Sequence, residues 1–141
     1  MIRLEKNFIL SELVHPALYK QFKGASYNML NIRLSPTLQS IRDVFGQMAI
    51  NGFFKGRLFK DSGLRLPHGK VGAKRSGHKF GYTADAKFYD TTPIEVQRHI
   101  LEHQEDFPYI TRMEDANITK TWLHIEVGTN NRVGAIYVFK P

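Results

Sequence analysis

The sequence of 141 residues contains no cysteine. Without thiols the chain can form neither a disulfide framework nor a thiolate zinc site, so any metal must be held by imidazole and carboxylate groups. Long apolar runs are missing as well, and roughly 20 apolar residues are needed to span a bilayer. Residues 1–16 mix charged with apolar residues and lack the apolar core of a signal peptide. We therefore expect synthesis in the cytoplasm without a signal peptide, and no membrane partner.

Repeats and linker-like stretches are also absent, which predicts one domain spanning residues 1–141. The formal net charge is +7, and such a charge favours polyanions such as nucleic acid, anionic lipid or the phosphate-rich polymers of a bacterial wall. Lys70, Lys74, Arg75 and Lys79 crowd one loop, which is as consistent with a solvated surface as with a binding patch. Aromatic residues do not interleave with these cations as they do in single-strand binders. We do not expect nucleic acid as a partner.

Capping residues and apolar spacing predict three helices. Pro16 should break or kink the first, Ser35 should cap the second and Gly46 should end it, and Thr92 should open the third with a capping box. The three helices are expected over residues 11–24, 35–46 and 92–106.

Alternating or apolar runs predict the strands. They cover residues 48–54, 82–88, 109–114, 121–127 and 133–139. Together with the helices, this order predicts an α+β fold with a mostly antiparallel sheet. Residues 55–77 show no clear period, so we expect a loop or irregular hairpin, and loops of that length are usually functional.

Two of these strands carry polar side chains opposite an apolar face. Successive side chains of a strand point to opposite sides, so Asp85 in one strand and His124 in the other should lie away from the core. If the strands are neighbours, these two side chains meet, and His78, just before Gly81, can fold back to them. Two imidazoles and one carboxylate are a suitable ligand set for Zn²⁺, with a fourth position left for water.

Several segments resemble one family of zinc peptidases. SGHKFGYTAD at residues 76–85 resembles the S-x-H-x-x-G-x-A-x-D signature of the D-Ala-D-Ala metallopeptidases, matching four of five positions with Thr83 in place of alanine. TWLHIE at residues 121–126 looks like the second motif, W-x-H-x-D/E, and SGLR at residues 62–65 resembles the substrate-binding segment. The opening FILSEL at residues 8–13 is similar to phage-encoded members.

The resemblance implies a fold shared with hedgehog signalling domains, with helices packed on one face of the sheet and the zinc site on the other. It makes His78, Asp85 and His124 the ligands of Zn²⁺. Arg65 becomes the substrate anchor, with Arg57 as the alternative, because a guanidinium can grip a carboxylate with two hydrogen bonds.

Two further residues receive roles from the same resemblance. Ser76 would orient the ligand loop or hydrogen-bond close to the metal. Trp122 would form part of the cleft floor.

The general base is the point at which the sequence departs from the family. Many relatives carry Glu or Asp three residues before the last histidine, where this chain has Thr121, and threonine cannot take a proton from water. Glu114 is the first substitute, because a hairpin between residues 109–114 and 121–127 would bring its carboxylate to the metal. Glu126 is the second, although it suits a role in orienting His124 better.

A competing motif lies on the third helix. His99 and His103, with Glu102 between them, fit the inverted zincin pattern H-x-x-E-H. Such enzymes need a further ligand on a distant helix, and no such helix follows, so we expect a solvent-facing pair. His15 and His68 are expected to be surface residues.

The implied function is a zinc-dependent peptidase that cleaves the peptide stems of bacterial peptidoglycan, as a phage endolysin or a virion-associated cell-wall hydrolase. The bond could be that of a D-Ala-D-Ala carboxypeptidase or of an L-Ala-D-Glu endopeptidase. The alternative is a catalytically weak or inactive member that serves as a phage structural or wall-binding module, with virion proteins as partners. The site of action would be the bacterial cell wall or the virion.

Overall fold

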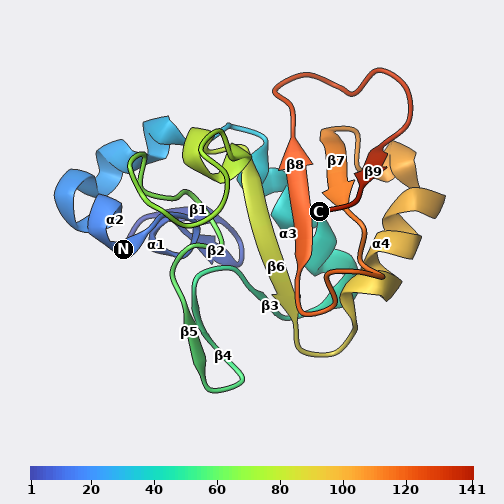
Figure 1. Ribbon diagram of the computed structural model, residues 1–141, viewed down its shortest axis with the longest axis horizontal. Coiled ribbons are helices and arrows are strands. Elements are labelled where there is room, and N and C mark those ends of the chain that lie inside the picture. The colour runs from blue at the N-terminus through green and yellow to red at the C-terminus, as the bar shows by residue number, and fades with distance from the viewer.

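A five-stranded sheet forms the centre of the fold (Figure 1). The computed structural model describes residues 1–141. The strands follow the order β3-β6-β8-β7-β9, and only the β7–β9 pair is parallel. Their bounds are β3 Met48–Ala49, β6 Thr83–Phe88, β7 Ile110–Glu114, β8 Leu123–Val127 and β9 Tyr137–Phe139. The α+β class with a mostly antiparallel sheet is thus confirmed.

Helices cover one face of this sheet. Helix α3 passes behind β6 and β8 in Figure 1, and buried residues of α3 and α4 belong to the same apolar cluster as Ala84, Ala86, Leu123 and Ile125 of the strands. Burial of alternate strand residues against these helices leaves Asp85 and His124 on the other face. The helices are α1 Leu10–Leu13, α2 Pro16–Phe22, α3 Leu34–Phe45 and α4 Pro93–Glu102, with 3₁₀ helices η1 Lys23–Met29, η2 Gly77–Phe80 and η3 Gln104–Asp106.

The first predicted helix is interrupted before Pro16, as expected, and forms two short helices. Helix α1 ends at Leu13, and α2 begins at Pro16. His15 is the N-cap of α2 and accepts a hydrogen bond from the Ala17 amide at Nδ1 (3.1 Å). The expectation that His15 is a surface residue was wrong, because this capping role buries the ring.

The start of α3 also differs from its prediction. Ser35 does not cap the helix but lies inside it and donates a hydrogen bond to Glu5 (3.0 Å). The N-cap is Arg33, which makes no side-chain capping hydrogen bond, and Asn31 accepts from the Arg33 amide (2.9 Å) in the turn just before the helix. Gly46 ends the helix at a positive φ, and Thr92 opens α4 with the capping box, both as expected.

The predicted strand over residues 48–54 is two strands in different sheets. The chain turns after β3 and enters β4 Gly52–Phe54, which pairs with β5 Arg57–Phe59 in a hairpin. This hairpin projects from the body of the molecule in Figure 1. Residues 60–76 then form the expected long loop, which contains no helix or strand.

A small hairpin of β1 Arg3–Glu5 and β2 Phe8–Ile9 precedes α1. None of the helices is both long and apolar enough to cross a membrane.

Candidate metal centre

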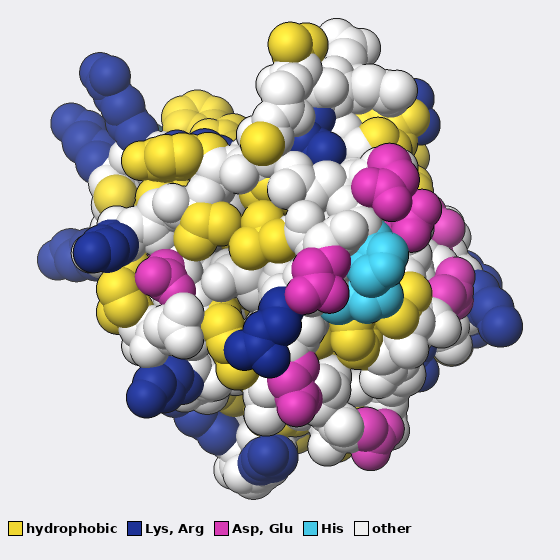
Figure 2. Space-filling model, turned by 90° about the vertical axis from the view of Figure 1, so that its right-hand side faces the viewer, with side chains coloured by type: hydrophobic (Ala, Val, Ile, Leu, Met, Phe, Trp, Pro, Cys, Tyr) yellow, Lys and Arg dark blue, Asp and Glu magenta, His cyan; other side chains and the backbone are white.

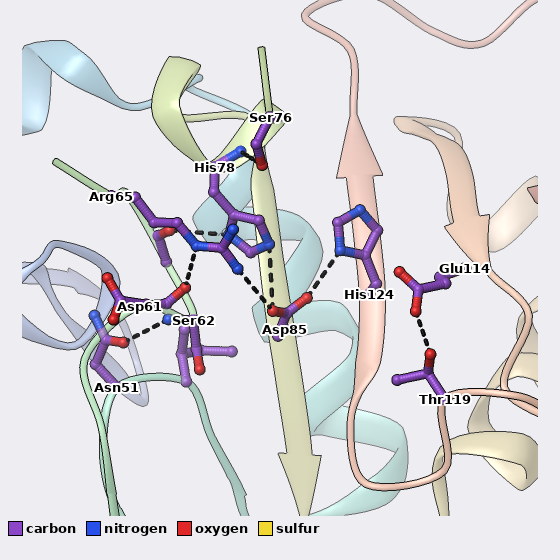
Figure 3. Close-up of polar contacts among 12 residues, drawn as sticks. Asn51, Asp61, Ser62, Arg65, Ser76, His78, Asp85, Glu114, Thr119 and His124 are labelled. Carbon is purple, nitrogen blue, oxygen red and sulfur yellow. Dashed lines mark hydrogen bonds and ion pairs between the residues drawn. The ribbon is translucent and has the colours of Figure 1, made fainter. Parts of the chain in front are cut away.

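Three side chains from separate elements meet on the open face of the sheet (Figure 3). Asp85 on β6 and His124 on β8 are directly opposite one another in the antiparallel register, and η2 supplies His78. Asp85 lies between the rings, with Oδ1 2.9 Å from His124 Nδ1 and Oδ2 3.3 Å from His78 Nε2. One ligand atom from each residue falls within 4.8 Å of the others. This group, mostly buried, could therefore bind a metal ion.

The orientation of His78 prepares one ring nitrogen for a cation. Ser76 accepts from the His78 amide (3.3 Å) and fixes the start of η2, while His78 Nδ1 lies 3.0 Å from the Gly63 carbonyl. A carbonyl can only accept, so Nδ1 carries a proton, and in the neutral ring Nε2 keeps the lone pair that a cation would need. Nε2 is buried without a hydrogen-bond partner and faces Asp85. When the His78 ring is neutral, Nε2 and the Asp85 carboxylate are two electron-rich atoms that face each other, an arrangement that a bound cation would explain.

His124 is held by carboxylates on both sides. Its Nδ1 faces Asp85 and its Nε2 lies 2.9 Å from Glu126. Burial lowers the pKa of His124, but hydrogen bonds and charge attraction from Asp85 and Glu126 outweigh it and raise the pKa to about 9. Burial raises the pKa of Asp85, yet both histidines together hold that pKa well below its usual range. At neutral pH the metal-free protein therefore has a charged His124 that must lose a proton before it can bind a metal.

Residues 62–65 run beside β6 and η2 and hydrogen-bond to two of the candidate ligand residues. The Ser62 carbonyl accepts from the Asp85 amide (2.8 Å), and the Arg65 amide donates to the His78 carbonyl (2.9 Å). The same segment pairs with the N-terminal region through the bridge between Leu64 and Val14. At Gly63, a Cβ atom would lie 2.3 Å from the Leu13 carbonyl, so only glycine permits this approach.

Lys87 is the important residue that the sequence patterns missed. Its ammonium group is fully buried and donates to the Ile50 carbonyl, to Ser62 Oγ (2.7 Å) and to the Asp85 carbonyl (3.2 Å). It also lies 4.2 Å from the centre of the Phe59 ring. Burial lowers the pKa of Lys87 to about 8, although Asp85 partly opposes this effect. Its place two residues after a ligand, on the same strand face, was the available signal.

A small pocket of about 150 Å³ opens beside Asp85. Arg65 enters it with its guanidinium held by the Asp61 carbonyl (2.7 Å) and 3.5 Å from Asp85. Arg57, the alternative anchor, lies over the Phe59 ring (4.6 Å). The lining residues are Arg57, Phe59, Asp61, Ser62, Arg65, Val71, Asp85 and Trp122. The predicted substrate residues Arg65 and Trp122 thus share one pocket with a ligand.

The two candidate bases lie on the opposite side of His124. Strands β7 and β8 form the expected hairpin, and Figure 3 shows Glu114 on β7, across His124 from Asp85. The Glu114 carboxylate accepts a hydrogen bond from Thr119 Oγ1. Glu126 contacts His124 directly and pairs with Arg112 (3.6 Å). Thr121 is exposed and lies outside β8.

The histidine pair on α4 forms a different arrangement. The rings of His99 and His103 stack at 4.3 Å, and His99 also packs against Phe45 at 5.1 Å. The pair is half-buried rather than solvent-facing, because Phe45 and Phe107 cover part of it. Figure 2 shows histidine side chains on this side of the molecule with acidic side chains nearby. No third residue completes a ligand group there.

Thr83 occupies the position at which the sequence departs from the peptidase signature. Its hydroxyl is buried without a hydrogen-bond partner, close to the backbone of Gly77.

Comparisons of the chain with protein-family models, curated proteins and solved structures gave no match.

Proposed function

We propose that the chain is a zinc-dependent peptidase that cleaves peptide stems of bacterial peptidoglycan. The observation that carries the proposal is the buried His78–Asp85–His124 group, in which His78 Nε2 lacks a hydrogen-bond partner. Two imidazoles and one carboxylate suit zinc better than the hard cations, which prefer oxygen ligands. The substrate class and the D-Ala-D-Ala metallopeptidase family come from the motif resemblance.

His78, Asp85 and His124 would hold the zinc ion. Zinc, when bound, supplies Lewis-acid activation of water and of a peptide carbonyl. Glu126 would keep His124 oriented through their 2.9 Å contact once His124 is neutral. The Gly63 carbonyl does the same for His78.

Arg65 would anchor the substrate. Its guanidinium lies in the pocket beside Asp85, where a substrate carboxylate could accept two parallel hydrogen bonds. Trp122 would form an apolar wall of the same pocket, next to the Phe59 ring at 6.5 Å. A pocket of about 150 Å³ suits the end of a short peptide rather than a bulky side chain.

Glu114 would move the proton. It lies on the strand next to His124, and the hydrogen bond from Thr119 holds its carboxylate in place. A carboxylate within hydrogen-bond reach of water or of the leaving amine can act as general base and acid.

The test is hydrolysis of two purified stem peptides, one ending in D-Ala-D-Ala and one containing L-Ala-D-Glu, by zinc-loaded protein. We expect cleavage of one of them, a loss of roughly 100-fold or more in kcat for Glu114→Gln, and a smaller loss for Glu126→Gln. Full activity of Glu114→Gln would overturn the assignment of the base. Absence of cleavage of both peptides by zinc-loaded wild type would overturn the peptidase.

A second candidate function is a catalytically weak or inactive member that serves as a phage structural or wall-binding module. It is favoured by the exposed Thr121, at the position where relatives carry an acid, and by the hydrogen bond that engages Glu114 with Thr119. This candidate predicts stoichiometric zinc with no turnover, and unchanged wall or virion association in a His124→Ala variant. In both cases the chain would act at the bacterial cell wall or in the virion.

A further inference from the structure

The net charge of the chain is concentrated in one stretch. Residues 55–87 contain nine Lys and Arg and two Asp, and this excess of seven equals the net charge of the whole protein. Residues 90–126 contain eight Asp and Glu and three Lys and Arg. The hairpin and the loop after it lie on the left of the sheet in Figure 1, and α4, which belongs to the acidic stretch, lies on the right.

Most of the cations in residues 55–87 form no ion pair. Six of them, on the β4–β5 hairpin and on the loop of residues 60–76, are exposed, and none forms an ion pair. The two acidic residues of the stretch are already engaged, Asp85 with the histidines and Asp61 near His15 (3.8 Å). We call the hairpin and loop together the basic platform, with the exposed cations Lys55, Arg57, Lys60, Lys70, Lys74 and Arg75.

The platform also exposes apolar side chains and reaches the metal centre. Phe53 and Leu58 are cross-strand neighbours on the hairpin and are 70% and 57% exposed. The hairpin contributes Arg57 and Phe59 to the pocket beside Asp85, and the loop contributes Val71. A ligand bound to the platform would therefore lie next to the pocket and could extend into it.

We propose that the basic platform binds a linear polyol-phosphate polymer attached to the bacterial wall, and thereby holds the metal centre against its substrate. Flexible lysines are point charges that suit phosphate groups without demanding a fixed geometry. A single nucleic-acid strand would need several aromatic side chains on which successive bases could stack. The platform exposes Phe53 on the hairpin, and the next exposed phenylalanine, Phe80, belongs to η2. The choice of this polymer rests on the proposed function.

The experiment compares two variants that each lose four exposed lysines. The platform variant carries Lys55→Gln, Lys60→Gln, Lys70→Gln and Lys74→Gln, none of which lines the pocket. The remote variant carries the same substitution at lysines outside the platform, which are also exposed: Lys6, Lys20, Lys120 and Lys140. Both variants therefore have the same net charge, and only the location of the lost charge differs.

Binding is measured by cosedimentation with insoluble walls that carry poly(glycerol phosphate), and with walls from which this polymer has been removed. All proteins also carry His124→Ala, so that the walls are not digested. For the platform variant we expect affinity at about 50 mM salt to fall at least about tenfold, and the slope of log Kd against log salt to decrease by up to about 3. The affinity of the remote variant for these walls should remain within about twofold of that of the protein with only His124→Ala.

Three outcomes would overturn the proposal. They are equal losses in both variants, equal binding to the stripped walls, and stronger competition by single-stranded DNA than by free poly(glycerol phosphate). The last would identify the platform as a nucleic-acid surface.

Turnover of a soluble stem peptide is followed separately, with His124 intact. The platform variant should match the wild type there. If the wild type cleaves no peptide, the proposed function fails while the binding result stands.

Discussion

Two pairs of histidines have rings that lie close together, but one pair is close in the sequence and the other is far apart in it. His99 and His103 are close in the sequence, on one face of α4, and their rings stack on each other. His78 and His124 are far apart in the sequence, and their ring centres are 5.2 Å apart with Asp85 between them. Only the second pair has a third candidate ligand beside it and a buried nitrogen without a hydrogen-bond partner. A motif match therefore needs support from the fold: the H-x-x-E-H pattern on α4 gathers no third candidate ligand, whereas the signature around His78 does.

The largest expected effect separates the two pairs by metal affinity. Structural zinc sites with four ligands bind with about 10–16 kcal/mol, so one ligand contributes about 2.5–4 kcal/mol, or roughly 60- to 700-fold in Kd. We expect His78→Ala and His124→Ala to lose zinc by this factor, whereas His99→Ala and His103→Ala keep one ion per chain. Elemental analysis and competition with a chelator measure both quantities. Loss of the ion from His103→Ala would reverse the comparison.

The next largest effect on metal affinity is expected at Lys87, which supports the candidate ligands without being one of them. Lys87→Met removes the ammonium that holds Ser62 and the Asp85 carbonyl. Partners of metal ligands typically contribute about 10- to 100-fold in metal affinity, and we expect a loss in that range for zinc and for cobalt. The matched control is Lys79→Met, since Lys79 also donates to a carbonyl, that of Gly69 (2.8 Å).

Stability and the histidine signals in NMR spectra distinguish a supporting role of Lys87 from general damage. A Lys87→Met protein that melts normally but gives altered His78 ring-nitrogen shifts supports the role. Unchanged metal affinity in a folded Lys87→Met protein contradicts it.

The pH dependence of stability sharpens the comparison in the metal-free protein. The pKa of His124 is raised from 6.5 to about 9, so its contribution is fully present below pH 6.5 and is lost as the pH rises through 9. Between pH 6.5 and 8 the partial loss of this contribution lowers the free energy of unfolding by about 2 kcal/mol. Above about pH 8, Lys87 acts in the opposite direction, because its folded pKa lies below its unfolded value. Urea titrations should show the decline in the wild type and in His103→Ala, but not in His124→Gln.

The smallest expected effect is on stability, at Thr83, whose buried hydroxyl has no hydrogen-bond partner. Thr83→Val keeps the shape of the side chain and removes a buried hydroxyl without a hydrogen bond, so we expect stabilisation of about 1 kcal/mol. Thr111→Val is the control, because the Thr111 hydroxyl donates to the Glu126 carbonyl (3.3 Å) and its loss should destabilise. Zinc affinity should change less than about threefold in both variants. A destabilised Thr83→Val protein would reveal a hydroxyl partner.

Local sequence signals predicted much of the fold. The stop at Gly46, the capping box at Thr92 and the break at Pro16 depend on one residue and its neighbours, and all three are found in the structure. The alternation that separates Asp85 and His124 from the apolar face was equally readable, because strand periodicity is local. The grouping of these two side chains with His78 followed from that alternation together with the motif resemblance.

The remaining features depend on contacts between distant segments. The bonds of Lys87 to Ile50 and Ser62, and the capping of α2 by a buried His15, arise only when several segments meet. The division of residues 48–54 between two sheets was missed for the same reason, since an apolar run does not say which strand it will pair with.

The bridge between Val14 and Leu64 limits how the metal centre can be transferred to another protein. Residues 76–85 with the β8 strand contain every candidate ligand and look like a unit that could be transferred. Yet the carbonyl that orients His78 belongs to Gly63, whose neighbour Leu64 is hydrogen-bonded to Leu13 (2.7 Å) and His15 (2.8 Å). A graft that omitted the N-terminal helices would carry the donor atoms but not their alignment. The smallest transplantable form of this centre is therefore most of the domain.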